Sequence, residues 1–411
     1  MNFLQFAIWG AYLTSMGTYL KSVGLAANIG LFYAMQGVVS LFMPALAGIV
    51  ADRWIPAQKM LGLCHLLAAG FMLSAGCYAN AAGEGVAFPT LFGLYAVSIA
   101  FYMPTLALSN SVAFTALNKA GLDTVRAFPP IRVFGTVGFI CSMLFVDAMG
   151  YQATCEQFFV SGAVGLLLGL YAFTLPACPV DRSGEKKSFV ETMGLKAFVL
   201  FKQKKMALFF IFSMLLGVSL QITNGFANPF ITTFKEIPEF AGTFGANHAN
   251  ALISLSQLSE TLCILLIPFC LRRFGIKRVM LIAMFAWVLR FGLFGLGNPG
   301  GGVWMFVLSM IVYGVAFDFF NISGALFVDK ETDISIRSSA QGLFMLMTNG
   351  IGAMLGTLGA QAVVNRFVFS REQPLEQIAG WSTSWYLFAA YALAVAIAFA
   401  LIFKYKHTTE K

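Results

Sequence analysis

The stretch VWMFVLSMIVYGVAFDFFNISGALFV, residues 303–328, decides the fold class, because Asp318 is its only charged residue. About twenty apolar residues in a row are enough to cross the hydrocarbon core of a bilayer. A charge placed there costs at least about 2.5–3.5 kcal/mol, so such residues generally pair with one another or line a wet cavity. Arg132, Glu260 and Arg290 interrupt other apolar stretches in the same way. The sequence therefore predicts a bundle of membrane helices around a polar path.

Composition points to the same class. Of the 411 residues, 59% are hydrophobic and 11% are charged, against about a quarter charged in soluble domains. The net charge is +8, but the basic residues fall between apolar stretches, which is the pattern of topology signals and predicts no nucleic-acid partner. Seven cysteines without a CxxC pair and three scattered histidines indicate neither a disulfide framework nor a metal site. We expect no metal and no organic cofactor.

Twelve apolar spans can be counted along the chain. The first begins almost at Met1 without a basic stretch or a small-residue cleavage site, so we interpret it as a retained helix. The prediction is an all-α integral membrane protein. The spans lie near 3–20, 30–50, 60–79, 89–113, 130–150, 157–177, 206–230, 247–270, 278–297, 303–328, 340–364 and 383–403.

Lysine and arginine counts predict the orientation. If both termini are cytoplasmic, the cytoplasmic segments carry 20 of these residues and the opposite loops carry four. Such an excess marks the cytoplasmic side of an inner membrane protein. We therefore expect a multi-pass protein of the bacterial inner membrane with both termini in the cytoplasm.

The longest polar stretch, residues 178–205, divides the spans into six and six. We predict an N-terminal six-helix bundle over 1–177, a cytoplasmic central loop over 178–205, and a C-terminal six-helix bundle with a short cytoplasmic tail over 206–411. The basic turns at 48–59 and 271–278 occupy the same place in each half. Two pseudo-symmetric bundles that rock about a central site are the architecture of alternating-access transporters.

The first of these turns, GIVADRWIPAQK, resembles the G-x-x-x-D-R/K-x-G-x-K/R loop of the major facilitator superfamily. Gly48, Asp52, Arg53 and Lys59 match in kind, whereas the second glycine is absent and the final base is displaced. Asp52 beside Arg53 could act as a gating latch between the halves. An ordinary short cytoplasmic turn explains the same residues, and both interpretations stay open.

Polar residues recur at helical spacing on the fifth span. Arg132, Thr136 and Phe139 are spaced i, i+4, i+7 and share a face. Pro129 and Pro130 come just before, where a helix start tolerates proline. Arg132 offers a fixed fork of donors for substrate oxygens. The alternative is that its side chain snorkels to the interface.

Amides and a carboxyl group mark the seventh and eighth spans. Gln221, Asn224 and Asn228 share one face, and Gln257 and Glu260 share another. Such amides either line a wet cavity or bond one helix to the next. A carboxyl group in a low-dielectric cavity binds its proton more tightly than in water, so Glu260 is a candidate proton carrier. A fixed ion pair with an arginine is the alternative.

On the tenth span, Tyr313 and Phe317 share a face with Asn321, and Asp318 is rotated by about 100° from Phe317. Arg290 and Asp318 both lie about 16–20 Å from the cytoplasmic end of their spans at 1.5 Å per residue. The sequence thus predicts an Arg290–Asp318 pair, with a structural role and a proton-relay role both open.

Several strings together resemble the NupG-type nucleoside permeases, the nucleoside:proton symporter family within the major facilitator superfamily. They are FMPALAGIVADRW, FPPIRVFGTVGFI, FFIFSMLLG, LQITN, SQLSETL, SMIVYGVAFDFFNISG and FKYKH. The resemblance runs from the first span to the last, and it implies proton-driven uptake of nucleosides such as uridine, adenosine or cytidine. The implied substrate-binding residues are Arg132, Thr136, Phe139, Gln221, Asn224, Gln257, Glu260, Tyr313 and Phe317. Asp318 matches the acid associated with proton coupling, so protons are the expected coupling ion.

The residues by themselves leave the substrate open. Amides, one hydroxyl, one guanidinium, one carboxyl and aromatic rings suit a neutral, hydroxyl-rich, partly flat molecule, which is a nucleoside or a sugar. No basic cluster is present to hold the phosphates of a nucleotide. A proton-coupled sugar or oligosaccharide symporter is the alternative within the superfamily.

A membrane enzyme would need a metal cluster or a nucleophile–base arrangement, and a receptor would bind ligand without moving it. We expect a monomer and no enzymatic activity.

Overall fold

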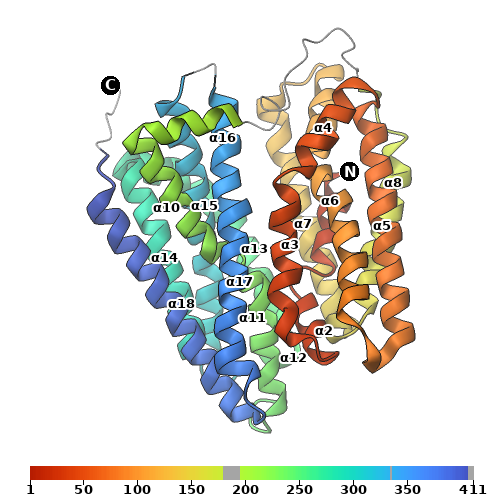
Figure 1. Cartoon of the computed structure of the whole chain (residues 1–411), viewed down its shortest axis with the longest axis vertical. Coiled ribbons are helices and arrows are strands. Elements are labelled where there is room, and N and C mark those ends of the chain that lie inside the picture. The colour runs from red at the N-terminus through yellow and green to blue at the C-terminus, as the bar shows by residue number, and fades with distance from the viewer. Residues whose placement is uncertain (179–194, 334–335, 406–411) are drawn as a thin grey trace. The chain divides into compact units, whose positions relative to one another are not determined.

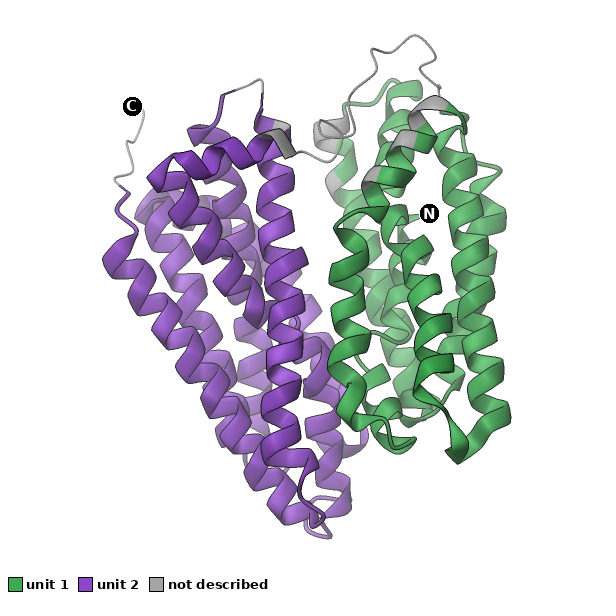
Figure 2. Cartoon of the chain, viewed as in Figure 1, with its two compact units in different colours: residues 1–192 green, residues 193–411 purple. Residues whose placement is uncertain are grey.

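The computed structural model describes residues 1–178, 195–333 and 336–405. Within these ranges every regular element is a helix and there is no strand. The chain divides into two compact units, residues 1–192 and 193–411 (Figure 2). The boundary lies inside the segment predicted as the central loop, and most of that segment is outside the described residues. Its end, Leu195–Lys202, forms a 3-10 helix.

The described residues of unit 1 form eight α-helices, of which two pairs are halves of broken spans (Figure 1). Short 3-10 turns connect some of them, and α5 packs against both α6 and α8. The helices are α1 (Asn2–Gly10), α2 (Met16–Ser22), α3 (Ile29–Ser40), α4 (Met43–Arg53), α5 (Ala57–Ala82), α6 (Phe88–Lys119), α7 (Thr124–Ala148) and α8 (Glu156–Ala172).

Unit 2 has a core of long helices in which α14 contacts both α15 and α18 (Figure 1). The predicted span 340–364 contains one π-helical segment, η6 (Leu346–Gly352), and a second one, η7 (Asn365–Phe369), follows directly after it. The remaining helices are α10 (Lys204–Leu220), α11 (Ile222–Thr233), α12 (Phe244–Asn247), α13 (Ala249–Phe274), α14 (Ile276–Leu296), α15 (Val303–Glu331), α16 (Arg337–Met345), α17 (Ala353–Val364) and α18 (Pro374–Ile402).

Nine helical segments of the described chain are long and apolar enough to cross a membrane. They coincide with the third to fifth and seventh to twelfth predicted spans. The sixth span corresponds to α8, which is shorter at 17 residues. The first two spans are each broken, at residues 11–15 and at 41–42. Pro44 lies in the first turn of α4, which explains a new helix start there because proline has no N–H to donate.

The last helix begins earlier than the sequence indicated. The apolar run predicts a start near residue 383, whereas α18 starts at Pro374. Proline at the first helical position has its φ already set for a helix, so the polar residues after it can form the opening turns. Hydropathy alone missed these turns because it measures apolar length and not helix starts.

Glycine allows α1 and α7 to touch through their backbones. A Cβ on Gly138 would lie 2.0 Å from the carbonyl oxygen of Phe3, and one on Gly10 would lie 2.3 Å from that of Phe139. No other residue fits at such a distance without moving one helix. The two glycines therefore set the spacing between α1 and the helix that carries Arg132.

Candidate functional site

The predicted site residues are divided between the two units. Unit 1 holds Arg132, Thr136 and Phe139, all on α7. Unit 2 holds the amides, acids and aromatic residues of α10 to α15. The side chains of Asp52 and Arg53, the predicted gating residues, lie outside what the structure describes.

In unit 1 the three residues differ in exposure. Arg132 is exposed on the unit and Thr136 is partly buried, whereas Phe139 is only 6% exposed. The Cζ atom of Arg132 lies 4.1 Å from the centroid of the Phe6 ring on α1, a cation–π contact. Arg132 therefore presents its guanidinium at the surface of unit 1 on an aromatic support, and Phe139 belongs to the packing.

The helix start predicted beside Arg132 is wrong. The sequence placed Pro129 and Pro130 just before the helix, but α7 begins at Thr124 and contains both. Proline inside a helix removes one backbone hydrogen bond. In membrane helices neighbouring groups often compensate for this loss, so a helix can continue through proline. The helix can therefore start before the proline residues at which the apolar span begins.

In unit 2, Gln221 lies at the break between α10 and α11. The Nδ2 of Asn224 donates to the Oε1 of Gln221 at 2.8 Å, and both side chains are partly exposed on the unit. Asn228 is different, because it is fully buried and its Nδ2 donates to the Oδ1 of Asn250 on α13 at 2.7 Å. Two of the three aligned amides are thus accessible on the unit, and the third bonds one helix to the next.

Helices α13 and α15 approach closely beside Glu260. A Cβ on Gly314 would lie 2.5 Å from the backbone oxygen of Ser259, and the Ser259 hydroxyl donates to the Ile311 carbonyl. Gln257 and Glu260 are partly buried on α13. Tyr313 and Glu260 are the chain neighbours of Gly314 and Ser259. The contact therefore brings the predicted acid next to the predicted aromatic pair.

The aromatic pair forms a continuous platform. The rings of Tyr313 and Phe317 are stacked, with centroids 5.5 Å apart and an interplanar angle of 18°. Trp287 on α14 meets Tyr313 edge-on, with centroids 6.0 Å apart at 88°. Tyr313 is 5% exposed, whereas Phe317 is only partly buried. The open part of the platform is therefore the Phe317 end.

Arg290 supports this platform from inside the unit. Its side chain is 2% exposed, and its Cζ lies 4.5 Å from the centroid of the Tyr313 ring. The Nη1 donates to the carbonyl of Ser309 at 2.7 Å and contacts the Ser256 hydroxyl at 3.5 Å. The Ser309 hydroxyl donates back to the Arg290 carbonyl at 3.0 Å. These contacts fix α14 against α15.

The predicted Arg290–Asp318 ion pair is not seen among the described residues. Asp318 is 5% exposed, and the arginine donates toward Ser309 instead. Ser309 and Asp318 are nine residues apart on α15, which is about 13 Å along the helix. The guanidinium of Arg290 lies over the ring of Tyr313. The equal depth of Arg290 and Asp318 in their spans did not identify the partner of Arg290, because the direction in which the arginine side chain extends determines its partner.

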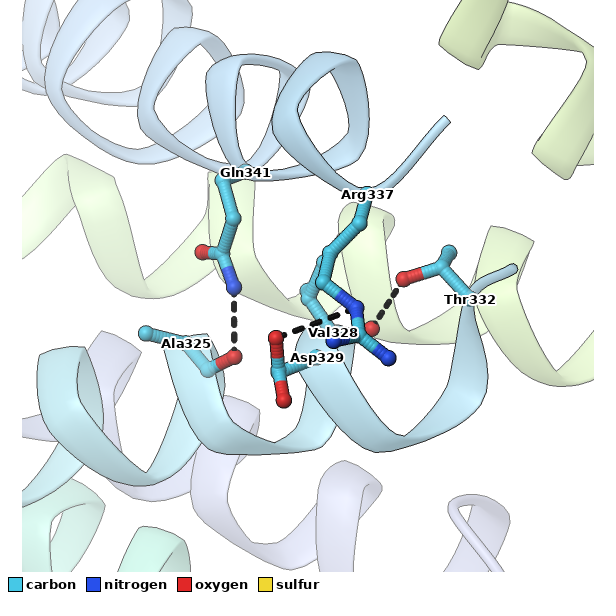
Figure 3. Close-up of polar contacts among 6 residues, drawn as sticks. All are labelled: Ala325, Val328, Asp329, Thr332, Arg337 and Gln341. Carbon is cyan, nitrogen blue, oxygen red and sulfur yellow. Dashed lines mark hydrogen bonds and ion pairs between the residues drawn. The ribbon is translucent and has the colours of Figure 1, made fainter. Parts of the chain in front are cut away.

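A second polar group lies at the turn between α15 and α16 (Figure 3). The Nε of Arg337 is 3.1 Å from the Oδ1 of Asp329, and the Nε2 of Gln341 donates to the Ala325 carbonyl at 2.7 Å. Both members of the ion pair are well exposed, so the pair is worth at most about 1 kcal/mol. The Gln341 bond ties α16 to α15 more directly.

Sequence reasoning missed three partners of the predicted residues. They are Phe6 beneath Arg132, Trp287 beside Tyr313, and Asn250 bonded to Asn228. Each lies on a different helix from its partner, so spacing within one helix carries no signal for it. Asn250 alone could have been noticed, as an amide near the start of an apolar span.

These features define a class. Two helical units with membrane-length apolar helices, charges buried within them and polar side chains on their surfaces make a multi-pass membrane carrier. The family model for nucleoside H+ symporters matches residues 1–408, and the chain therefore belongs to the nucleoside H+ symporter family. The resemblance drawn from the sequence is confirmed.

Individual relatives agree with this assignment. The xanthosine permease of Escherichia coli (strain K12) is 46% identical over 414 residues, covering 100% of this chain and 96% of the relative. A crystal structure of a variant of the nucleoside transporter NupG aligns with a TM-score of 0.92 at 44% identity, covering 98% of each chain. The xylose transporter XylE from E. coli aligns with a TM-score of 0.62 at 11% identity over 98% of each chain, which shows the fold alone. The predicted all-α major facilitator fold is confirmed, whereas the roles of the site residues stay predictions.

Proposed function

We propose that this protein takes up nucleosides together with protons across the bacterial inner membrane, by alternating access of its two units. The observation that carries the proposal is the stacked Tyr313–Phe317 platform on α15, where α15 packs closely against Ser259, the neighbour of Glu260 on α13, in a chain of the nucleoside H+ symporter family. A flat base stacks on an aromatic ring, and a carboxylate accepts hydrogen bonds from ribose hydroxyls. One arrangement thus offers a partner to each part of a nucleoside.

The substrate contacts follow from exposure within each unit. In unit 2 the base stacks on Phe317, and the amides of Gln221 and Asn224 already pair through one bond, which leaves further donors and acceptors for the substrate. In unit 1 Arg132 donates to substrate oxygens from its support on Phe6. Gln257, Thr136 and Phe139 complete the proposed set, with Phe139 acting through packing.

Uridine, adenosine and cytidine are the proposed substrates. Xanthosine belongs on the same list, because one relative is named a xanthosine permease. The stacking platform accepts any base, so preference among bases depends on the side chains that reach its edges. The shared fold with a xylose transporter makes a sugar the outcome to exclude by competition.

The proposed cycle uses one acid, Glu260 or Asp318, as the proton carrier. With the site open to the outside the acid takes a proton, and nucleoside binding then favours closure. Opening to the more alkaline cytoplasm releases both, and the empty carrier returns. Arg290 takes no proton in the proposed cycle; its contacts support a role in holding Tyr313 and the α14–α15 interface.

The remaining features of the proposal come from the sequence. Both termini are cytoplasmic, because the lysine and arginine counts place the basic loops on that side. The protein acts as a monomer, carries no cofactor and catalyses no covalent reaction. Among the described residues no group of three metal-ligating side chains occurs.

Uptake of labelled uridine into proteoliposomes, with and without an inward proton gradient, tests the proposal. Accumulation that collapses with a protonophore is expected. Equilibration unaffected by the gradient would keep the nucleoside site and remove the proton role. If excess xylose or maltose abolished uptake and excess adenosine did not, the sugar function would replace the nucleoside function.

A further inference from the structure

A small cavity lies inside unit 1, between helices that are far apart in the sequence. It has a volume of about 10 Å³, which is about the space that one water molecule needs. Its wall includes apolar residues and five polar side chains from α5, α6, α8 and the turn after α1. The polar ones are Tyr12, His65, Ser98, Tyr102 and Ser161.

The hydrogen-bond chain beside the cavity fixes the proton position on His65. The Thr105 hydroxyl donates to the Tyr102 carbonyl, so it can only accept from the Nε2 of Gln5, 2.7 Å away. The amide oxygen of Gln5 therefore faces the Nε2 of His65 at 2.8 Å and accepts a hydrogen bond from its N–H group. In a neutral imidazole with its proton on Nε2, Nδ1 is an acceptor.

That Nδ1 atom is buried without a hydrogen-bond partner from the protein. His65 itself is 1% exposed and lies in the cavity wall. A buried acceptor without a donor destabilises the folded state, because it has lost its hydrogen bond to water. A donor in the cavity would remove that destabilisation.

We propose that this cavity binds one water molecule, which donates a hydrogen bond to the Nδ1 of His65. The second hydrogen atom of the water has acceptors in the same wall. The hydroxyls of Ser98 and Ser161 donate hydrogen bonds to the carbonyls of Ala68 and Ile8, so their oxygen atoms are free to accept one from the water. Tyr12 also lines the cavity, and we assign its hydroxyl as a third contact of the water. Two or three hydrogen bonds are what a buried water typically makes.

The water joins a network that holds α1. Gln5 is bonded through its side chain to α5 and α6, and its carbonyl accepts from the Tyr102 hydroxyl at 2.8 Å. Phe6, the next residue, lies beneath Arg132. The water site therefore also helps to position Arg132 through Gln5 and Phe6, a role that rests on the proposed function.

Solid-state NMR of the protein with ¹⁵N-labelled histidine in lipid bilayers tests the water site independently of transport. The spectrum is expected to show His65 with a protonated Nε2, a non-protonated Nδ1, and magnetisation transfer from water to Nδ1. Loss of the signal in His65→Gln assigns it among the three histidines. A protonated Nδ1, or an Nδ1 without transfer from water, would overturn the proposal.

Two variants test the positioning role. His65→Gln keeps one donor and one acceptor and is expected to retain the KM for uridine, whereas His65→Leu removes both and is expected to raise KM several-fold. Equal KM values in folded samples of both variants would overturn the positioning role and leave the NMR result untouched. If His65→Leu does not fold, Tyr12→Phe replaces it, with weaker water transfer to Nδ1 and a smaller rise in KM expected.

Discussion

Replacing Gly138 by alanine should push α1 away from α7 and disturb the support of Arg132. The new Cβ would lie 2.0 Å from the carbonyl oxygen of Phe3, and contacts below 3.0 Å essentially never occur. One of the two backbones must therefore move by about 1 Å or more. Overpacking of this kind costs about 1–3 kcal/mol. The Arg132–Phe6 distance of 4.1 Å depends on the same two helices.

We expect two measurable effects of Gly138→Ala. The midpoint of thermal unfolding in detergent should fall by several degrees, at about 2–4 °C per kcal/mol. The KM for uridine in proteoliposomes should rise on the order of tenfold, equivalent to ~1.4 kcal/mol of binding. Gly93→Ala on α6 is the matched control, because Gly93 is exposed and a Cβ there would meet nothing within 4 Å. If both variants showed the same midpoint and KM, the close-approach reasoning would be refuted.

Three further variants test the acids and the buried arginine. Glu260→Gln should impair proton-driven accumulation of uridine, and full accumulation in that variant would remove Glu260 as the carrier or as an essential ligand. Asp318→Asn should reduce gradient-driven uptake at least about tenfold while exchange of uridine continues, if Asp318 is the carrier; unchanged accumulation would assign the proton elsewhere. Arg290→Lys keeps the charge but loses the planar fork, and a charged hydrogen bond such as that to Ser309 is worth about 1.5–3 kcal/mol. Its KM should rise while accumulation stays sensitive to a protonophore, and a wild-type KM would show that the Tyr313 platform does not need the guanidinium.

The sequence predicted the helices of unit 2 better than those at the start of unit 1. Apolar length located α13, α14 and α15 to within a few residues. It did not reveal that the first two spans are each broken. Hydropathy sums side-chain transfer energies over a window, and that sum depends on which residues are present and not on whether the helix is broken at two to five of them.

The sequence predicted the individual residues of the candidate site, but it did not predict which side chains on neighbouring helices they contact. Helical spacing placed Tyr313 and Phe317 on one face, and their rings are stacked. The same spacing placed Asn228 beside Gln221 and Asn224, yet Asn228 bonds to Asn250 in the interior. Spacing defines a face of one helix, whereas the neighbouring helix decides whether that face is open.

The sequence by itself determined the membrane class, the family and the residues that interrupt the apolar spans. These follow from composition and local order, because the cost of placing a charge in hydrocarbon depends on the residue and the length of its span. Only the tertiary structure decided that Arg290 bonds to Ser309 and supports Tyr313, and that His65 directs one nitrogen to Gln5. Such partners depend on how two helices are rotated and shifted against each other, and packing across the bundle sets both.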